Sequence, residues 1–419
     1  MSGADPAPEE EDRVASSARV PEAEPPPAPA PAPAPAAPES RPHPAPALVA
    51  REASARVDGV DAARGIALVG MFVAHVAPAV ANPWVQAAIS VSDERPRLLF
   101  ALTAGLGLAF ISGGTRPVPR GPGGGRARLR VQIAIRAAIL IALGLFIAAA
   151  LHPLVFIILD VYGIAFLLMI PLLFLPPWVA LGAGALLLAV TPGLAVIVSG
   201  TEWVGAARMT GWRIPVDWAF SGAYPVIEWV PVMLIGLALG RFGITRGPVL
   251  AWSAAAGAFL AVALLAPATA ILDAATRAGA SSFVGGSGQV ADATRLALAV
   301  GESARALANV GIGVVVVAAC VWLTARLAPS ARRVAGIALS PFTAMGSMPF
   351  TIYTLHLIVL AGSIRIENGV LTDDSWALTA GLVFGSMAFA LLWRHFIGRG
   401  PLEQLMRAAT GRGRVGGRG

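Results

Sequence analysis

About ten apolar runs follow one another between residues 62 and 397 of this chain. A run of about 20 apolar residues has the length that an α-helix needs to cross the hydrocarbon core of a bilayer. Backbone groups cannot stay unpaired in lipid, and the runs lack the alternation of barrel strands, so each run is predicted to be a helix. The expected cores are 62–80, 97–113, 130–151, 154–175, 177–199, 223–241, 248–270, 305–327, 341–363 and 376–397. The sequence therefore predicts an all-α, polytopic transmembrane helix bundle.

The composition excludes a soluble globular protein. Hydrophobic residues make up 56% of the chain and charged residues 13%, whereas soluble domains carry about 25% charged residues. The net charge of +7 comes from arginines in short loops between apolar runs, a pattern that orients membrane proteins. We therefore expect no nucleic-acid partner. The single cysteine, Cys320, allows no disulfide within the chain and no thiolate metal cluster, so no metal is expected.

The distribution of arginines predicts the orientation. With the N-terminus inside, the inner loops and the C-terminal end carry twice as many arginines as the outer loops. The positive-inside rule then favours a multi-pass protein of the cell membrane with both ends in the cytoplasm. Two tight hairpins are expected, at His152-Pro153 and at Pro176-Pro177. The chain is also expected to contain three regions. The regions are a disordered Pro/Ala-rich cytoplasmic tail (1–55), a transmembrane domain (56–408) and a flexible basic end (409–419).

Ionisable side chains at membrane depth are costly and are functional candidates by default. Arg64 and His75 lie on the first predicted helix, eleven residues apart. Eleven residues are close to three helical turns, so the two side chains share a face and lie about 16 Å apart along the axis. Asp160, Glu228 and His356 fall in the outer third of three other helices, and Tyr353 precedes His356 by one turn. These positions predict a polar cavity that is open to the outer side.

Each candidate also has a simpler explanation. Arg64 can be an anchor at the inner face, paired with Asp61, and an intramembrane histidine can be a hydrogen-bonding packing residue. Glu228 can be solvated at the interface, and Arg95 can be a plain loop charge. The motifs Gly236-x-x-x-Gly240 and Gly381-x-x-x-Gly385 are typical of close helix packing.

Several motifs resemble a known family. The segment 57–67 followed by His75, in which Arg64, ten residues and a histidine follow one another, resembles the first helix of the transmembrane acyltransferase superfamily. That superfamily includes heparan-alpha-glucosaminide N-acetyltransferase. The segments 95–105, 346–356 and 399–407, together with Tyr162-Gly163 and 229–241, are similar to YeiB-like membrane proteins, known as domain of unknown function 418. The resemblance covers residues 57 to about 410.

The resemblance implies transfer of an acyl group from acyl-CoA, with acetyl-CoA as the expected donor. The acceptor would be a hydroxyl or amine of a glycan or lipid-linked sugar on the outer side. His75 would be the base for the attacking group, because imidazole titrates near neutrality. Asp160 or Glu228 would orient that ring. Arg64 would hold coenzyme A phosphates near the cytoplasmic face.

The remaining candidates are expected to bind substrate. His356 and Tyr353 would bind the acceptor or stabilise the developing oxyanion. Glu228, Asp61 and Arg95 are also expected to contribute to substrate binding. Membrane lipids are expected partners, and the pattern leaves the oligomeric state open.

Two other function classes fit the same pattern. A secondary transporter or flippase for an envelope precursor would also have about ten helices and a buried polar cluster. We find no inverted repeat and no matched pair of broken helices, which is evidence against transport. A non-catalytic envelope scaffold would not need histidines inside the membrane.

Overall fold

The computed structural model describes residues 57–121, 124–221, 225–282, 288–367 and 369–411. The predicted tail lies outside the described residues, as does 412–419 of the predicted basic end. The helices that form the bundle, with their connections, are α2 (Asp58–Val76), α3 (Pro83–Ser90), α4 (Arg95–Ile111), α5 (Gly125–Leu151), α6 (Leu159–Leu172), α7 (Pro177–Ser199), α8 (Glu202–Arg208), α9 (Arg213–Val216), the π-helix η1 (Asp217–Ser221), α10 (Val226–Phe242), α11 (Gly247–Ser282), α12 (Gly288–Ala325), α13 (Pro329–Ser347), α14 (Pro349–Gly362), α15 (Trp376–Phe396) and α16 (Pro401–Ala409).

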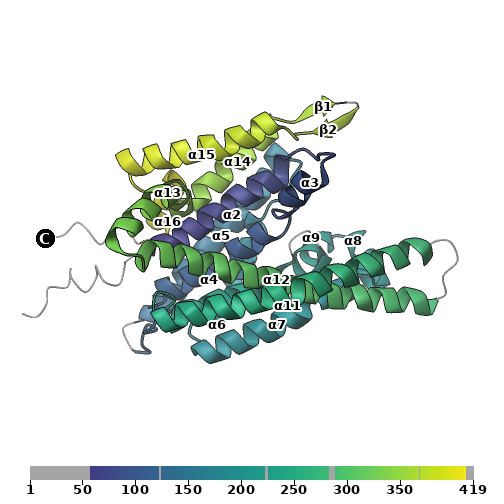
Figure 1. Ribbon diagram of the computed structural model, residues 1–419, viewed down its shortest axis with the longest axis horizontal. Coiled ribbons are helices and arrows are strands. Elements are labelled where there is room, and N and C mark those ends of the chain that lie inside the picture. Colours follow the sequence, from purple (N-terminus) through teal and green to yellow (C-terminus); the bar gives the residue numbers. More distant parts are fainter. Residues whose placement is uncertain (1–56, 122–123, 222–224, 283–287, 368, 412–419) are drawn as a thin grey trace, which may run out of the picture. The chain divides into compact units, whose positions relative to one another are not determined.

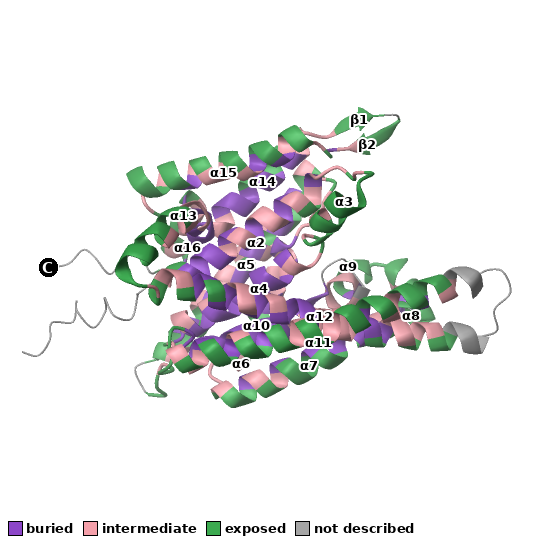
Figure 2. Cartoon of the chain, viewed as in Figure 1, coloured by how far each residue is buried: buried purple, intermediate pink, exposed green. Residues whose placement is uncertain are grey.

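The structure confirms the all-α class (Figure 1). In the described part of the chain, six helices are long and apolar enough to cross a membrane, or seven if the bent pair α13 and α14 is one span. The strands that it contains, β1 (Arg365–Glu367) and β2 (Val370–Thr372), form one antiparallel hairpin. Large apolar side chains such as Val262 and Phe259 are exposed on the outward faces of the helices (Figure 2). Because those faces would meet lipid, the protein is a multi-pass membrane protein in contact with lipids.

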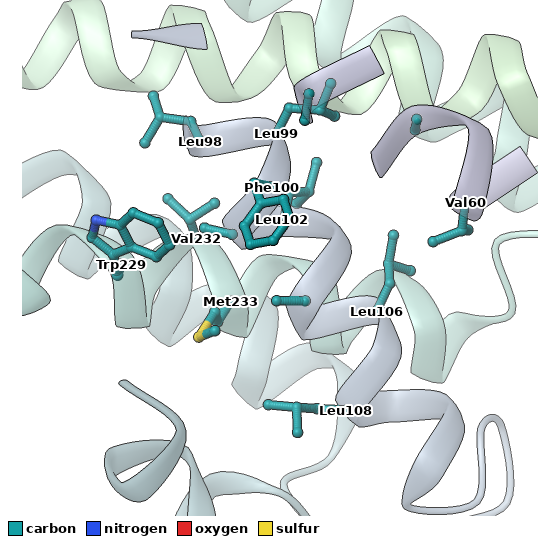
Figure 3. Close-up of a cluster of buried hydrophobic side chains, with 14 of the residues drawn as sticks. Val60, Leu98, Leu99, Phe100, Leu102, Leu106, Leu108, Trp229, Val232 and Met233 are labelled. Carbon is teal, nitrogen blue, oxygen red and sulfur yellow. The ribbon is translucent and has the colours of Figure 1, made fainter. Parts of the chain in front are cut away.

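The core lies where α4 packs against α2 and α10 (Figure 3). Glycines allow this close approach. A Cβ on Gly105 would overlap the backbone of Met233, and a Cβ on Gly236 would overlap the carbonyl oxygen of Leu102. The first predicted Gly-x-x-x-Gly motif therefore packs as expected. The second does not, because a Cβ on Gly381 or Gly385 would meet nothing within 4 Å among the described residues.

The structure corrects the predicted fourth helix, 154–175. α5 ends at Leu151, and His152 adopts a left-handed conformation with φ 46°. The chain then runs without helix until Leu159, so the connection at His152-Pro153 is a loop rather than a tight hairpin. α6 has 14 residues, about 21 Å at 1.5 Å per residue, which is too short to span a bilayer alone. The predicted hairpin at Pro176-Pro177 is present as a short turn before α7.

The predicted ninth helix, 341–363, is broken in two. α13 and α14 meet at Met348 with a bend of 79°. Pro349 occupies the first turn of α14, where its missing N–H costs nothing. Glu403 of α16 accepts hydrogen bonds from the backbone nitrogens of Phe350 (2.8 Å) and Thr351 (3.2 Å). The carboxylate of α16 therefore caps the new helix start that the proline creates.

α11 and α12 form a long hairpin and lie side by side (Figure 1). α11 has 36 residues, about 54 Å at 1.5 Å per residue, whereas the hydrocarbon core is about 30 Å thick. The hairpin is therefore longer than the hydrocarbon core is thick. The predicted runs 248–270 and 305–327 lie within α11 and α12.

Candidate functional site

Two histidines from distant parts of the chain meet between α2 and α14. His75 lies in the last turn of α2 and His356 in α14. Nδ1 of His75 lies 3.3 Å from Nε2 of His356, and the rings stack at 5.5 Å with an interplanar angle of 14°. Phe72 and Tyr353 pack against the His356 ring at 5.0 and 4.7 Å. His356 is buried, while His75 is partly exposed.

The hydrogen bonds of the pair assign its protons. Nδ1 of His356 lies 2.5 Å from the carbonyl oxygen of Tyr353, and a carbonyl only accepts, so this nitrogen carries a hydrogen. In the neutral ring Nε2 of His356 is then an acceptor, and Nδ1 of His75 donates to it. The nitrogen of His75 that is left with a lone pair is Nε2. The pair thus fixes one tautomer of His75.

His75 lines a pocket of about 840 Å³, counted with its open mouth, at the predicted outer end. Arg97 and Asp93 contribute charge to the pocket wall, and Ser92 contributes a hydroxyl. The loop between α5 and α6 contributes Val155 and Phe156 to the lining. Partial burial raises the pKa of the Asp93 carboxyl, and a hydrogen bond from Ser90 opposes that rise. A solvent-accessible pocket therefore reaches one histidine of the pair.

Glu228 and Arg95 make polar contacts next to this pocket. Glu228 pairs with Arg97 at 3.3 Å rather than with a histidine. Arg95 donates to Asn309 at 3.2 Å, and Asn309 in turn donates to Glu94. These bonds tie α4 to α10 and α12. Glu228 pairs with Arg97 of the pocket wall, and Arg95 acts electrostatically on Asp93 of the same wall.

Asp160 does not contact the histidine pair. One of its oxygens accepts from the indole nitrogen of Trp218 at 2.8 Å, and the other accepts from the backbone of Val161 at 2.9 Å. The carboxylate therefore fastens η1 to the start of α6. Asp160 therefore has no contact with His75 that would orient its ring, and the residue in contact with that ring is His356.

Arg64 and Asp61 form the predicted pair, at 2.8 Å. Arg64 also donates to the carbonyl oxygens of Gly346 (2.9 Å) and Thr103 (3.1 Å). Its guanidinium thereby joins α2, α4 and α13. These three acceptors use much of its hydrogen-bonding capacity, which leaves less of it for a phosphate.

Two features of this region are not predicted from the sequence. The loop 152–158 lines the pocket, although the sequence predicts most of it as helix. Arg136 lies inside α5, an apolar helix, and is not among the predicted site residues. A charge six residues after Arg130 and within an uncharged run is itself a signal, because few residues of this kind are tolerated there.

The comparisons with known proteins give the family. Residues 56–269, just over half of the chain, match the model described as heparan-alpha-glucosaminide N-acetyltransferase, catalytic. The chain belongs to this N-acetyltransferase family. Residues 268–413 match a second model, described as protein of unknown function (DUF418). Together they confirm the resemblance to YeiB-like proteins within this acyltransferase group. No curated protein matches the chain.

The site of this N-acetyltransferase family member crosses the boundary between the two matched regions. His75 lies in the first region and His356 in the second. Within the described ranges, no group of three or more His, Cys, Asp or Glu side chains is placed to hold a metal. The histidine pair is therefore a joint feature of both regions.

Proposed function

We propose that this protein transfers an acyl group from acyl-CoA to a hydroxyl or amine of an envelope glycan or lipid-linked sugar. The family is one of membrane acyltransferases, which supports the reaction class. The observation that carries the proposal is the histidine pair with a free Nε2 at a pocket open to solvent. A plasma-membrane location, acetyl-CoA as donor and an acceptor on the outer side are parts of the same proposal.

The chemistry needs one base, because a thioester is already activated. Nε2 of His75 takes the proton of the acceptor O–H or N–H as the oxygen or nitrogen attacks the thioester carbon. The C–S bond breaks, and the proton passes from His75 to the leaving thiolate of coenzyme A. The products are the acylated acceptor and free coenzyme A, and His75 returns to its starting tautomer.

His356 acts as a positioning residue in this scheme. Its Nε2 accepts the Nδ1 hydrogen of His75 and so holds the ring in the reactive tautomer. When His75 becomes positively charged, the same contact stabilises the hydrogen on Nδ1. The backbone oxygen of Tyr353 holds His356 in turn. In this proposal, His356 takes the orienting task that the sequence predicts for Asp160 or Glu228.

The proposed activity is tested by envelope acylation in a strain that lacks this protein. We expect the glycan or lipid-linked sugar of the deletion strain to lack an acyl group that the parent carries. A plasmid copy of the wild-type protein should restore it from labelled acetyl-CoA. Equal acylation in the deletion strain and its parent would contradict the proposal. Unacylated precursor that accumulates on the inner side would favour the transporter or flippase instead.

Substitution of His356 separates positioning from packing. His356→Leu removes the acceptor for His75, and we expect kcat to fall about 10- to 100-fold, the cost of a lost hydrogen bond in the transition state, with little change in KM. His356→Gln keeps a carbonyl oxygen near the position of Nε2, so most of the activity should return. Rates measured with labelled acetyl-CoA in membrane vesicles provide the readout. If glutamine is as poor as leucine, the hydrogen bond has no catalytic role.

A further inference from the structure

Asp93 is the carboxylate of the pocket that contains His75. It lies in the turn between α3 and α4 and is exposed. Backbone hydrogen bonds hold this turn. The nitrogen of Ser92 donates to the oxygen of Ile89 at 2.8 Å, and the nitrogen of Asp93 donates to the oxygen of Ser90 at 3.3 Å. A hydrogen-bonded turn therefore presents the Asp93 carboxylate to the pocket, directly before the first residue of α4.

Asp93 keeps capacity to bind a ligand. It forms no ion pair with any residue that the structure describes, and it accepts a hydrogen bond from the side chain of Ser90. A carboxylate has about four lone-pair sites, so further donors can bind to it. Arg97, the guanidinium group of the pocket wall, already pairs with Glu228 at 3.3 Å and with Glu94 at 3.6 Å. Asp93 is therefore the charged group of the lining that has room for a substrate.

The charges around the pocket disfavour an anionic ligand. Ion pairs and electrostatic interactions connect four carboxylates with three guanidinium groups near the start of α4, namely Asp93, Glu94, Glu228 and Glu302 with Arg95, Arg97 and Arg305. Negative charge is thus in excess, and a phosphate or carboxylate of a ligand would be repelled here. Hydroxyl groups, in contrast, donate strong hydrogen bonds to a carboxylate. The phosphates of coenzyme A therefore do not match this pocket, whereas an acceptor with hydroxyl groups does.

The size and the lining of the pocket suit the ring of a sugar. The volume open to the centre of a water molecule is about 370 Å³, which falls in the range of about 300–1,000 Å³ of ligand sites. Polar groups of Ser92 and Asp93 line it together with the apolar side chains of Met71, Leu154 and Phe156. A sugar ring has hydroxyl groups at its edge and C–H groups on its faces, so it can use both kinds of lining.

We propose that Asp93 accepts hydrogen bonds from the hydroxyl groups of a sugar ring without acidic groups, and so holds the acceptor beside Nε2 of His75. The charge of Asp93 makes the pocket reject acidic sugars. This inference rests on the proposed function, in which the sugar carries the attacking hydroxyl or amine. It adds the residue that binds the acceptor and the charge class of the acceptor.

Protection of His75 from chemical modification tests this binding without turnover. Diethyl pyrocarbonate reacts with the lone pair of a neutral imidazole, which His75 presents at Nε2. Mass spectrometry gives the modification rate of each histidine in full-length protein in phosphatidylcholine nanodiscs, with methyl glucoside or methyl glucuronide. The two sugars share one ring and differ in the carboxylate of the glucuronide. We expect methyl glucoside to protect His75 with an affinity at least about tenfold higher than methyl glucuronide, while exposed His395 reacts at an unchanged rate.

Two substitutions of Asp93 separate its hydrogen bonds from its charge. Asp93→Ala removes both, so protection by methyl glucoside should weaken about 10- to 100-fold. Asp93→Asn keeps a carbonyl oxygen without the charge. It should retain part of the affinity for methyl glucoside and bind the two sugars within about threefold of each other.

The matched control is Asp273→Ala, which removes an exposed carboxylate of α11, and it should resemble the wild type. Equal protection by the two sugars in the wild type would overturn the inference. Protection by neither sugar, or unchanged protection in Asp93→Ala, would overturn it as well.

Kinetics distinguish the failure of this inference from the failure of the proposed function. In membrane vesicles that transfer label from acetyl-CoA, Asp93→Ala should raise the KM for added envelope acceptor about 10- to 100-fold, with a smaller effect on kcat and on the KM for acetyl-CoA. A rise in the KM for acetyl-CoA alone would place the donor in this pocket and overturn the inference. If the wild type transfers no label, the proposed function fails, and the protection of His75 still decides whether Asp93 binds the sugar.

Discussion

Replacement of His75 by asparagine is expected to lower the rate of acyl transfer by about 100- to 10,000-fold, the usual contribution of a general base. Asparagine places an amide N–H near the position of Nδ1, so the hydrogen bond to His356 can persist. It provides nothing at the position of Nε2, where the proposed proton transfer takes place. The variant should therefore remain inserted and folded while it loses activity. The rate of label transfer from acetyl-CoA in membrane vesicles measures the effect.

The matched control for this variant is His395→Asn. His395 lies exposed in the last turn of α15, in the opposite part of the bundle from the predicted outer pocket. We expect its replacement to leave the rate within about twofold of the wild type, as is usual for surface positions away from a site. Normal activity in His75→Asn, at equal protein levels, would remove His75 from the mechanism.

Replacement of Gly346 by alanine is expected to destabilise the protein by about 3 kcal/mol or more. A Cβ at this position would overlap the carbonyl oxygen of Asp61, and a Cβ on Gly65 would overlap that of Phe342. α2 and α13 thus cross with their backbones in contact, and rigid backbone has no room to yield. The same contact positions the Gly346 oxygen to accept from Arg64. Thermal unfolding of the purified protein in detergent measures the loss.

Gly336→Ala is the control on the same helix. A Cβ at Gly336 meets nothing within 4 Å among the described residues. Alanine there should leave stability unchanged or raise it by about 0.5–1 kcal/mol, because glycine is the poorer residue in a helix interior. If both variants unfold at the same temperature, the close crossing of α2 and α13 does not hold the bundle together.

The sequence predicted the helical runs well because hydropathy and length respond to the same property, the thickness of the bilayer. It failed where tertiary contacts decide local structure. The break at Met348 depends on Glu403, about fifty residues away, which caps the start of α14. The loop before Leu159 is stabilised in part by the hydroxyl of Tyr353, which accepts from the backbone of Ile158 at 3.1 Å. Neither contact can be predicted from the hydropathy of the residues around it.

The candidate site was predicted in part. Arg64 and Asp61 are three residues apart on one helix, so their ion pair can be predicted from the spacing alone. The predicted candidates His75, His356 and Tyr353 also lie together in the structure. Depth alone placed Asp160 and Glu228 in the same layer, but depth says nothing about the side of a helix on which a neighbour packs. Both carboxylates have partners elsewhere, Trp218 and Arg97. Arg136 is not among the predicted site residues, although it is a charge within the apolar run of α5.

The most direct test of the central claim follows a labelled acyl group from acetyl-CoA to the envelope glycan in membrane vesicles. The vesicles contain equal amounts of wild-type, His75→Asn or His395→Asn protein. The account predicts label in the glycan with the wild type and with His395→Asn, and a loss of at least about 100-fold with His75→Asn. Equal label in all three vesicle preparations, or no label above that of vesicles lacking the protein, would contradict it.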